Sequence, residues 1–336
     1  MNWDAGNYRT LQRRSLLAVG AVVAPLLSAM GQSASLPRVG LMATAPLTPS
    51  SQPIFDAFMS GVAEAGMVVD RDFILERRYH GGDGQKMAAQ AAELVALGVR
   101  VIVAPSTQTA LAAKAATRNI PIVFIGAGDP IGSGLAQSLA HPAGNVTGVS
   151  SQGVDFALKQ FELMREVVPA SRRIAVMVNP ENQPHASGLS QIQNAAVGAG
   201  IEIVPVVKRN AADIEAAIKT AFGRSCDALI VFDDAVTNSP SRRDIIRQTI
   251  ELRLPSMYQW RFYVAEGGLM SFGPVLTDLF KRGGTFIPRL LRGGSPEMMP
   301  IEQPTRFELV INLKTAKAIG LTIKPTVLAR ADEVIE

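Results

Sequence analysis

The feature that most constrains this chain is the regular alternation of short apolar runs with helical patterns, which begins at Leu36. The run "VIVAPS" at 101–106 has the length and β-branched content of a buried strand, and "QTALAAKAATR" after it has helical character. The same order continues through "DALIVFDD", "RRDIIRQTIELR" and "LPSMYQW". Strands that alternate with helices in this way predict βαβ units on a parallel sheet, so we expect an α/β fold.

The chain repeats this arrangement in two successive halves. Residues 101–124 run from a strand through a turn and a helix into a second strand, and residues 229–258 do the same. Alignment of the two segments places Ser106 opposite Asp234. Two successive α/β halves of this kind predict two lobes that face each other across a cleft.

The N-terminal segment has the features of an export signal. Paired arginines at 13 and 14 precede the uncharged segment Leu16–Met30. With about 15 residues this segment is too short to cross a bilayer, for which a helix needs about 20. We expect a twin-arginine-like signal peptide at 1–35, cleaved near residues 31–35, and a periplasmic mature protein without stable membrane insertion. A membrane-anchoring N-terminal helix and export by the general secretory route are the alternatives.

Composition and motifs exclude several classes of protein. The formal net charge of +4 is spread along the chain without a basic stripe, which argues against nucleic-acid binding. The single Cys226 excludes an internal disulfide framework, and the three histidines lack the spacing of metal ligands. Gly126 and Gly128 resemble the start of a dinucleotide fingerprint, but Ile131 occupies the position of the third glycine. We therefore expect no cofactor and no metal and, without a catalytic motif, no enzyme.

Candidate ligand groups follow the predicted strands, because ligands of open parallel sheets bind outside the carboxyl ends of the strands. Ser106 and Thr107 end one strand and begin a helix whose N-terminus suits a carboxylate, although such hydroxyls also serve as helix caps. Asp233 and Asp234 end another strand and suit an ammonium group, although a turn or a cap explains them equally. Two such sites on facing lobes would match the two ends of an α-amino acid.

Aromatic residues gather after one further strand. Only 6% of the chain is aromatic, yet four aromatic residues fall between Tyr258 and Tyr263. If the lobes face each other, Tyr258 and Trp260 provide flat apolar walls for a ligand. The alternative is that both residues belong to the core of the sheet.

A specific pattern occurs in three long segments, which are "IPIVFIGAGDPIGSGLAQSLAHPAGNVTGVS", "LPSMYQWRFYVAEGGLMSFGP" and "IEQPTRFELVINLKTAKAIGLTI". Through them Leu36–Glu336 resembles the family of bacterial ABC-transporter substrate-binding proteins that includes tryptophan- and tyrosine-binding members. The resemblance implies a type I periplasmic-binding fold, in which two Rossmann-like α/β lobes with parallel sheets, joined by a three-crossing hinge, close on a small ligand.

The resemblance also assigns ligand-binding positions in this chain. They fall on Ser106, Thr107, Asp129 in a Gly-Asp-Pro turn, Asn179 and Asp234. We add Thr44, which directly follows the first predicted strand. The chain departs from the family at Asp233, where other members often have proline or threonine, and a second carboxylate there favours a more cationic ligand.

The resemblance and the repeat together lead to one expected function. We expect a monomeric solute-binding component of an ABC importer, which binds an amino acid or an aromatic compound and works with permease subunits. We expect residues 36–148, with 274–303 returning, to form the first lobe, and residues 149–273, with 304–336 returning to the hinge, to form the second. A protein that presents its ligand to a separate sensor and an exported α/β enzyme are the alternatives.

Overall fold

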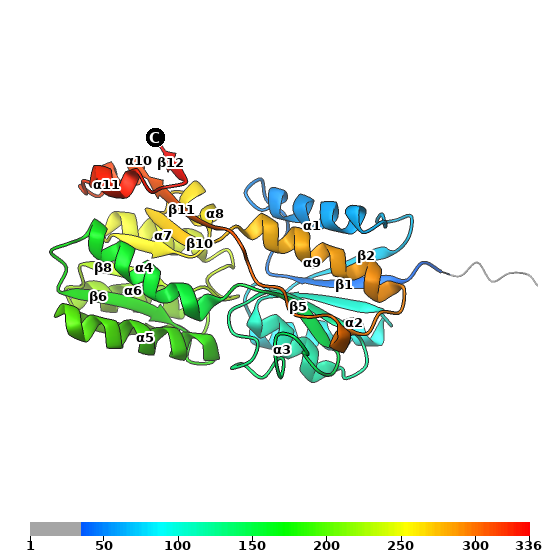
Figure 1. The fold of residues 1–336 in the computed structure, drawn as a ribbon. Coiled ribbons are helices and arrows are strands. Elements are labelled where there is room, and N and C mark those ends of the chain that lie inside the picture. The colour runs from blue at the N-terminus through cyan, green and yellow to red at the C-terminus, as the bar shows by residue number, and fades with distance from the viewer. Residues whose placement is uncertain (1–34) are drawn as a thin grey trace, which may run out of the picture. The chain divides into compact units, whose positions relative to one another are not determined.

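The frame of the protein is a pair of β-sheets, each of which has helices on both faces (Figure 1). The computed structural model describes residues 35–336, and their side chains except at 154 and 155. Residues 36–336 form one compact unit, and the expected signal peptide lies outside the described residues except for Ser35. Within the described range, no helix is both long and apolar enough to cross a membrane.

The first sheet, within the described residues, has five parallel strands in the order β2-β1-β3-β4-β5. Its strands are β1 (Arg38–Ala43), β2 (Ile74–Tyr79), β3 (Val101–Pro105), β4 (Ile122–Ala127) and β5 (Val146–Ser150). One face carries α1 (Gln52–Glu64) and α9 (Leu276–Leu291), and the other carries α2 (Gly84–Ala96) and α3 (Thr107–Ala116). The strand predicted at 101–106 and the one that follows its helix are present as β3 and β4.

The second sheet of the described chain has seven strands in the order β12-β11-β10-β9-β8-β6-β7. Its strands are β6 (Arg173–Val178), β7 (Glu202–Val207), β8 (Ala228–Val231), β9 (Ser256–Tyr258), β10 (Met270–Pro274), β11 (Phe307–Asn312) and β12 (Glu333–Ile335). The helices α4 (Gly153–Val167) and α5 (Gln183–Ala199) pack together, as do α6 (Asp213–Gly223) and α7 (Arg242–Glu251). The shorter helices are α8 (Arg261–Ala265), η1 (Pro296–Met298), α10 (Leu313–Ala318) and α11 (Pro325–Leu328).

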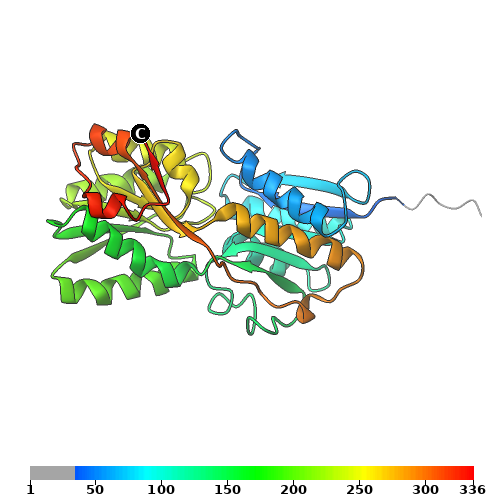
Figure 2. The same ribbon diagram turned by 45° about the horizontal axis from the view of Figure 1, so that its top comes forward.

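The chain passes between the two sheets three times within the described range. It crosses between β5 and α4, between β10 and α9, and in the segment 299–306 before β11. As a result α9, which follows a strand of the second sheet, packs against α1 over the first sheet (Figure 2). β10 leaves the second sheet and β11 returns to it, which is why this one pair is antiparallel. The expected fold of two α/β lobes with three hinge crossings is confirmed.

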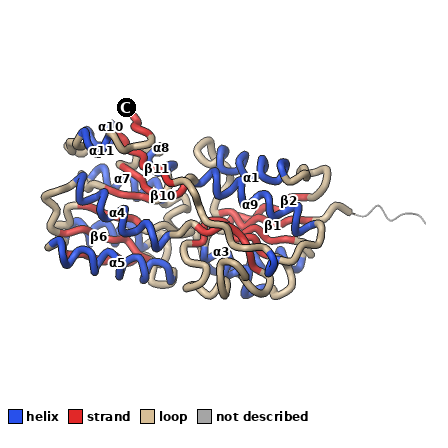
Figure 3. The backbone as a smooth tube through the Cα atoms, viewed as in Figure 1, coloured by secondary structure: helices blue, strands red, loops and turns tan. Residues whose placement is uncertain are grey.

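Local sequence signals set the ends of several helices, and the alternation of helix and strand that results is clear in Figure 3. The carboxylate of Asp83 accepts hydrogen bonds from the N–H groups of Gln85 (2.8 Å) and Lys86 (3.1 Å), so it caps α2. Gly98 follows that helix with a φ of +72°. Helix α4 begins after Gln152, which has a φ of +54°.

Helices α1 and α9 approach each other so closely that glycine is required at their contact. A Cβ atom on Gly61 would lie 1.9 Å from the carbonyl oxygen of Lys281, and one on Gly284 would lie 2.2 Å from that of Phe58. Since both obstacles are backbone atoms, a larger side chain has to push the helices apart. This contact fixes α9 to the first lobe, and with it the position of the hinge crossing that precedes α9.

We predict that Gly61→Ala destabilises the protein by about 1–3 kcal/mol, because it overpacks this contact. Gly198→Ala is the matched control, since Gly198 is an exposed helical residue of α5 with open space around its Cα. There the gain in helix propensity should stabilise the protein by about 0.5–1 kcal/mol. Urea denaturation of both variants measures the difference, and equal midpoints would contradict the close approach.

Candidate functional site

Two adjacent cavities lie between the lobes, beyond the carboxyl ends of the strands. The polar cavity has a volume of about 40 Å³, and its lining includes Ser106, Thr107, Asn182, His185, Asp233 and Asp234. The apolar cavity has a volume of about 190 Å³, and its lining includes Thr44, Phe55, Phe58, Trp260, Phe262 and Phe280. Ser106, Gly126 and Asp233 line both. The two cavities therefore form one candidate site with a polar end and an apolar end.

On the first lobe, the polar cavity contains the N-terminus of α3. Ser106 precedes this helix, and its hydroxyl accepts a hydrogen bond from the N–H of Thr109 at 3.3 Å. Its φ of +94° is unusual for a residue with a side chain, and such strain is concentrated at functional sites. The hydroxyl of Thr107 accepts a hydrogen bond from the N–H of Gly128 at 3.2 Å. Since the first N–H groups of a helix have no partner within it, this end of the cavity suits an anion.

On the second lobe, Asp234 forms a fully buried ion pair with Lys208, which follows β7. The same carboxylate accepts hydrogen bonds from the Asn179 amide (2.9 Å) and from the N–H groups of Val236 and Thr237 (3.0 Å each). Burial alone would raise the pKa of Asp234, but the Lys208 ammonium and the hydrogen bonds to the carboxylate together outweigh it and hold that pKa below its ordinary value. Asp234 is therefore ionised, and its charge is balanced by the protein itself.

Asp233 lies in a different environment from its neighbour. One oxygen, Oδ2, accepts a hydrogen bond from the Asn238 amide at 3.0 Å. The other, Oδ1, has almost no accessible surface and no hydrogen-bond partner among the described residues. Burial raises the pKa of Asp233 to about 7, even though the nearby Trp260 indole favours the ionised form. This carboxyl group is thus the one acidic side chain of the site whose charge the described residues leave unbalanced.

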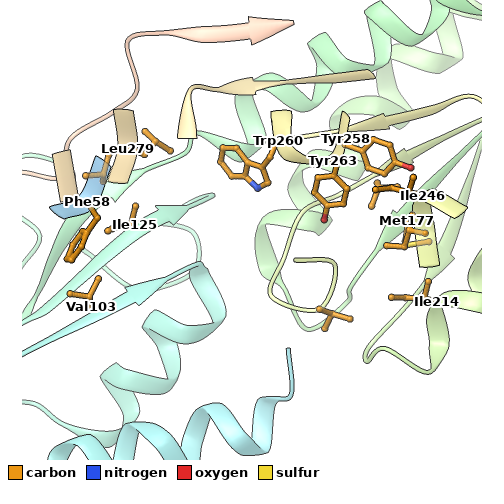
Figure 4. Packing of buried hydrophobic residues seen from close by; sticks show 14 of the residues in the cluster. Phe58, Val103, Ile125, Met177, Ile214, Ile246, Tyr258, Trp260, Tyr263 and Leu279 are labelled. Atoms are coloured by element: carbon orange, nitrogen blue, oxygen red, sulfur yellow. The ribbon is translucent and has the colours of Figure 1, made fainter. Parts of the chain in front are cut away.

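The apolar end of the site is built from aromatic side chains of both lobes. Phe55 and Phe58 come from α1, Phe280 comes from α9, and Trp260 and Phe262 come from the segment after β9. Trp260 is only 3% exposed, and Figure 4 shows its indole between the buried residues of the two lobes. Thr44 also lines this cavity, as the sequence suggested. The wall that was expected from Trp260 is therefore present.

Three predicted ligand groups line neither cavity. Tyr258 is fully buried in the core of the second lobe, where its ring stacks on Tyr263 at 4.7 Å and its hydroxyl is 3.2 Å from that of Thr249. Asp129 uses its carboxylate within its own turn, because Oδ1 accepts a hydrogen bond from the N–H of Gly132 at 2.8 Å. Asn179 is buried beneath the site and holds Asp234 there. The remaining six predicted residues do line the site, namely Thr44, Ser106, Thr107, Asp233, Asp234 and Trp260.

Sequence reasoning missed the residues that organise the polar end. Lys208 directly follows the apolar run "IEIVPVV", so the rule for strand ends that selected Asp234 would also have selected it. His185 carries no such signal, because it lies in the first turn of α5 and becomes part of the site only through the fold. Its Nδ1 accepts a hydrogen bond from the N–H of Asn179 at 2.9 Å, and its Nε2 is 2.9 Å from the carbonyl oxygen of Asp233.

The two lobes touch each other on either side of the site. Gln108 at the start of α3 accepts a hydrogen bond from the N–H of Ala235 at 2.9 Å. At the rim of the apolar cavity, the Ser50 hydroxyl donates to Glu266 at 2.7 Å. Glu266 is also paired with Arg242, with an N–O distance of 2.7 Å. These contacts place the structure in a closed arrangement of the lobes.

The two-lobed fold, the hinge crossings and the central cleft define a ligand-binding protein of the type I periplasmic class. A family model described as "ABC transporter substrate binding protein" matches residues 47–335, which is most of the chain. The chain belongs to this family, which confirms the resemblance drawn from its sequence.

Known relatives agree with this assignment. The chain is 28% identical over 222 residues to a tyrosine-binding protein of Clostridioides difficile (strain R20291), a match that spans 66% of this chain and 63% of that protein. It is 26% identical to a Streptococcus pneumonia ABC domain solved in complex with L-Trp, with a TM-score of 0.80 over 90% of this chain and all of the other. A ligand-free, open substrate-binding protein from Clostridium difficile shares the fold, with 23% identity, a TM-score of 0.60 and coverage of 89% and 99%.

We predict that Asp233→Asn stabilises the protein at high pH. The pKa of Asp233 is about 7 in the folded protein and about 3.9 in an unfolded chain. The folded state thus binds more protons between these values, and the parent loses stability as the pH rises from about 4 to about 7. The amide side chain of the Asp233→Asn variant does not titrate, so the variant does not lose this stability. The stability difference between variant and parent should therefore grow by about 2 kcal/mol from pH 5 to pH 8.

Urea denaturation of both proteins across this pH range provides the measurement. Burial lowers the pKa values of His80 and His185 to about 4, so both histidines destabilise the folded protein as the pH falls. Both are present in the parent and in the variant, so their contribution cancels in the stability difference. A stability difference that stays constant with pH would contradict the assigned environment of Asp233.

Proposed function

We propose that this protein is the solute-binding component of an ABC importer, and that it binds an aromatic amino acid between its lobes in the periplasm. The main support is that a polar cavity and an aromatic-lined cavity adjoin in a single cleft. The polar end combines a helix N-terminus with acidic side chains, and these groups complement the carboxylate and the ammonium of an amino acid. The apolar end complements a flat side chain.

The relatives support the same ligand class. One carries the name of a tyrosine-binding protein, and another was solved with L-Trp. In our proposal, the ligand's carboxylate meets the N–H groups at the start of α3, and its ring packs beside Trp260. Groups from both lobes are then needed to complete the site, so the ligand stabilises the closed arrangement that the permease subunits recognise.

The proposal includes how the protein is exported and how it moves. Residues 1–35 direct export and are removed, and the mature chain acts as a monomer. Residues 36–148 with 274–303 move as one lobe, and residues 149–273 with 304–336 move as the other. A protein that serves a separate sensor would have the same cleft, so co-purification with a permease rather than with a sensor distinguishes these two roles.

We favour binding over catalysis because of how the histidine in the polar cavity is held. Both ring nitrogens of His185 are engaged, one by the N–H of Asn179 and the other at the carbonyl oxygen of Asp233. Burial lowers the pKa of His185 to about 4. A histidine held in this way is a poor general base, because neither nitrogen is free to take a proton from a substrate.

We predict that isothermal titration calorimetry detects binding of L-tryptophan, L-tyrosine or L-phenylalanine, at least about tenfold tighter than binding of L-alanine, because only aromatic side chains fill the apolar cavity. Trp260→Ala should weaken binding of the aromatic ligand by about 30-fold, the equivalent of about 2 kcal/mol. Tyr258→Phe is the control, since that hydroxyl lies in the core and should not affect binding. The proposal fails if no aromatic amino acid binds, or if Trp260→Ala binds it as tightly as the parent.

A further inference from the structure

Two adjacent carboxylates, Asp233 and Asp234, follow β8, and their surroundings give them opposite capacities for a ligand. Asp234 already accepts hydrogen bonds from Lys208, the Asn179 amide and two backbone N–H groups. To bind a ligand's ammonium it would have to give up one of these partners in a fully buried setting. Loss of one partner of a buried ion pair is strongly unfavourable, because the other charge is left unbalanced. Asp234 therefore serves to hold its loop in place.

Asp233 has the free capacity that Asp234 lacks. The Asn238 amide occupies Oδ2, whereas no hydrogen bond from the described residues reaches the inaccessible Oδ1. The main chain of Asp233 is held as well, because its carbonyl oxygen lies 2.9 Å from Nε2 of His185. The carboxyl group is thus held in position, and Oδ1 makes no hydrogen bond within the described residues, although the Trp260 indole also stabilises the ionised carboxylate.

The location of Asp233 is the second reason to assign it a ligand. It is one of three residues that line both the polar and the apolar cavity, so it lies where the main-chain atoms of an amino acid would join its side chain. The helix N-terminus at Ser106 lines the same junction from the facing lobe. An amino acid that placed its carboxylate at that helix would bring its ammonium to the opposite side of the junction.

The charges around Asp233 are already paired with one another. Lys208 is paired with Asp234, and Arg242 shares the carboxylate of Glu266 with the exposed Arg243. The remaining titratable neighbours are Tyr263, whose hydroxyl donates to the carbonyl oxygen of Thr237 at 2.8 Å, and His185, which is neutral above a pKa of about 4. None of these described cations forms an ion pair with Asp233, which makes it the acidic group of the site that gains most from a cationic ligand.

We propose that Asp233, rather than Asp234, receives the ammonium group of the ligand and thereby selects amino acids over aromatic acids that lack an amine. This inference rests on the proposed function and identifies the residue that determines specificity within the same site. It departs from the assignment to Asp234 that the family resemblance implies. It also explains why the chain has Asp233 although this carboxyl group lowers the stability of the free protein, since binding sites often retain destabilising groups that serve function.

The proposal has a consequence for the pH dependence of binding. An ammonium ion binds the ionised carboxylate, and Asp233 is mostly protonated at pH 6 but mostly ionised at pH 8, since its pKa is about 7. The apparent affinity scales with the fraction of protein in the competent form. Affinity for an amino acid should therefore rise about tenfold from pH 6 to pH 8, and the rise should be absent from Asp233→Asn.

The test is isothermal titration calorimetry of the exported protein and its Asp233→Asn variant with two probes. L-Tryptophan has the ammonium group, and indole-3-propionate is the same molecule without it. With L-tryptophan at pH 8, we expect Asp233→Asn to bind about 30-fold more weakly or worse. With indole-3-propionate, the two proteins should differ by less than about threefold, since there is no ammonium to lose. The variant keeps the shape of the side chain, and its urea denaturation curve reports folding separately.

The outcomes separate this inference from the proposed function. If the parent binds L-tryptophan but Asp233→Asn matches it in affinity and pH profile, the inference is overturned and the proposed function stands. Equal losses for both probes would also overturn it, because Asp233 would then shape the cleft rather than bind the amine. If the parent binds no aromatic amino acid at either pH, both proposals are overturned together.

Discussion

The buried ion pair between Lys208 and Asp234 is the interaction on which the rest of the cleft depends. It anchors the loop after β8, and that loop carries Asp233 into the site and Ala235 against Gln108 of the other lobe. Both charges are fully inaccessible, so moving the loop away would leave a buried charge without its partner. One pair therefore fixes the position of the free carboxyl group and the contact that closes the lobes.

The topology of the chain explains why residues of both lobes line the cleft. Parallel strands bring their carboxyl ends to one edge of each sheet, and the three crossings turn those two edges toward each other. The same crossings bring α9 onto α1, so that aromatic residues from distant parts of the chain meet Trp260. A polar end and an apolar end are thus assembled from residues of both lobes, and a ligand that contacts them all is held best when the lobes are closed.

Much of this could be predicted from the sequence, because the strand pattern and the strand-end rule are local. They predict Ser106, Asp233 and Trp260 at one cleft, and in the structure these three residues line its two cavities. Tyr258 could not be separated from Trp260 in this way, because a strand with strict alternation would point both residues to the same side. In the structure β9 ends at Tyr258 and the chain turns into α8, which leaves only Trp260 in the cleft. The strand-end rule also points to Lys208 but not to its pairing with Asp234, because that pairing depends on the neighbouring strands β6, β7 and β8 and not on sequence spacing.

We propose that the cleft holds an aromatic amino acid with its ammonium on Asp233 and its ring beside Trp260. A crystal structure of the complex with L-tryptophan tests it most directly. We expect an ammonium nitrogen within about 3 Å of a carboxylate oxygen of Asp233 and an unbroken pair between Lys208 and Asp234. An ammonium bound to Asp234 with Lys208 displaced, or a ligand outside the cleft, would contradict it.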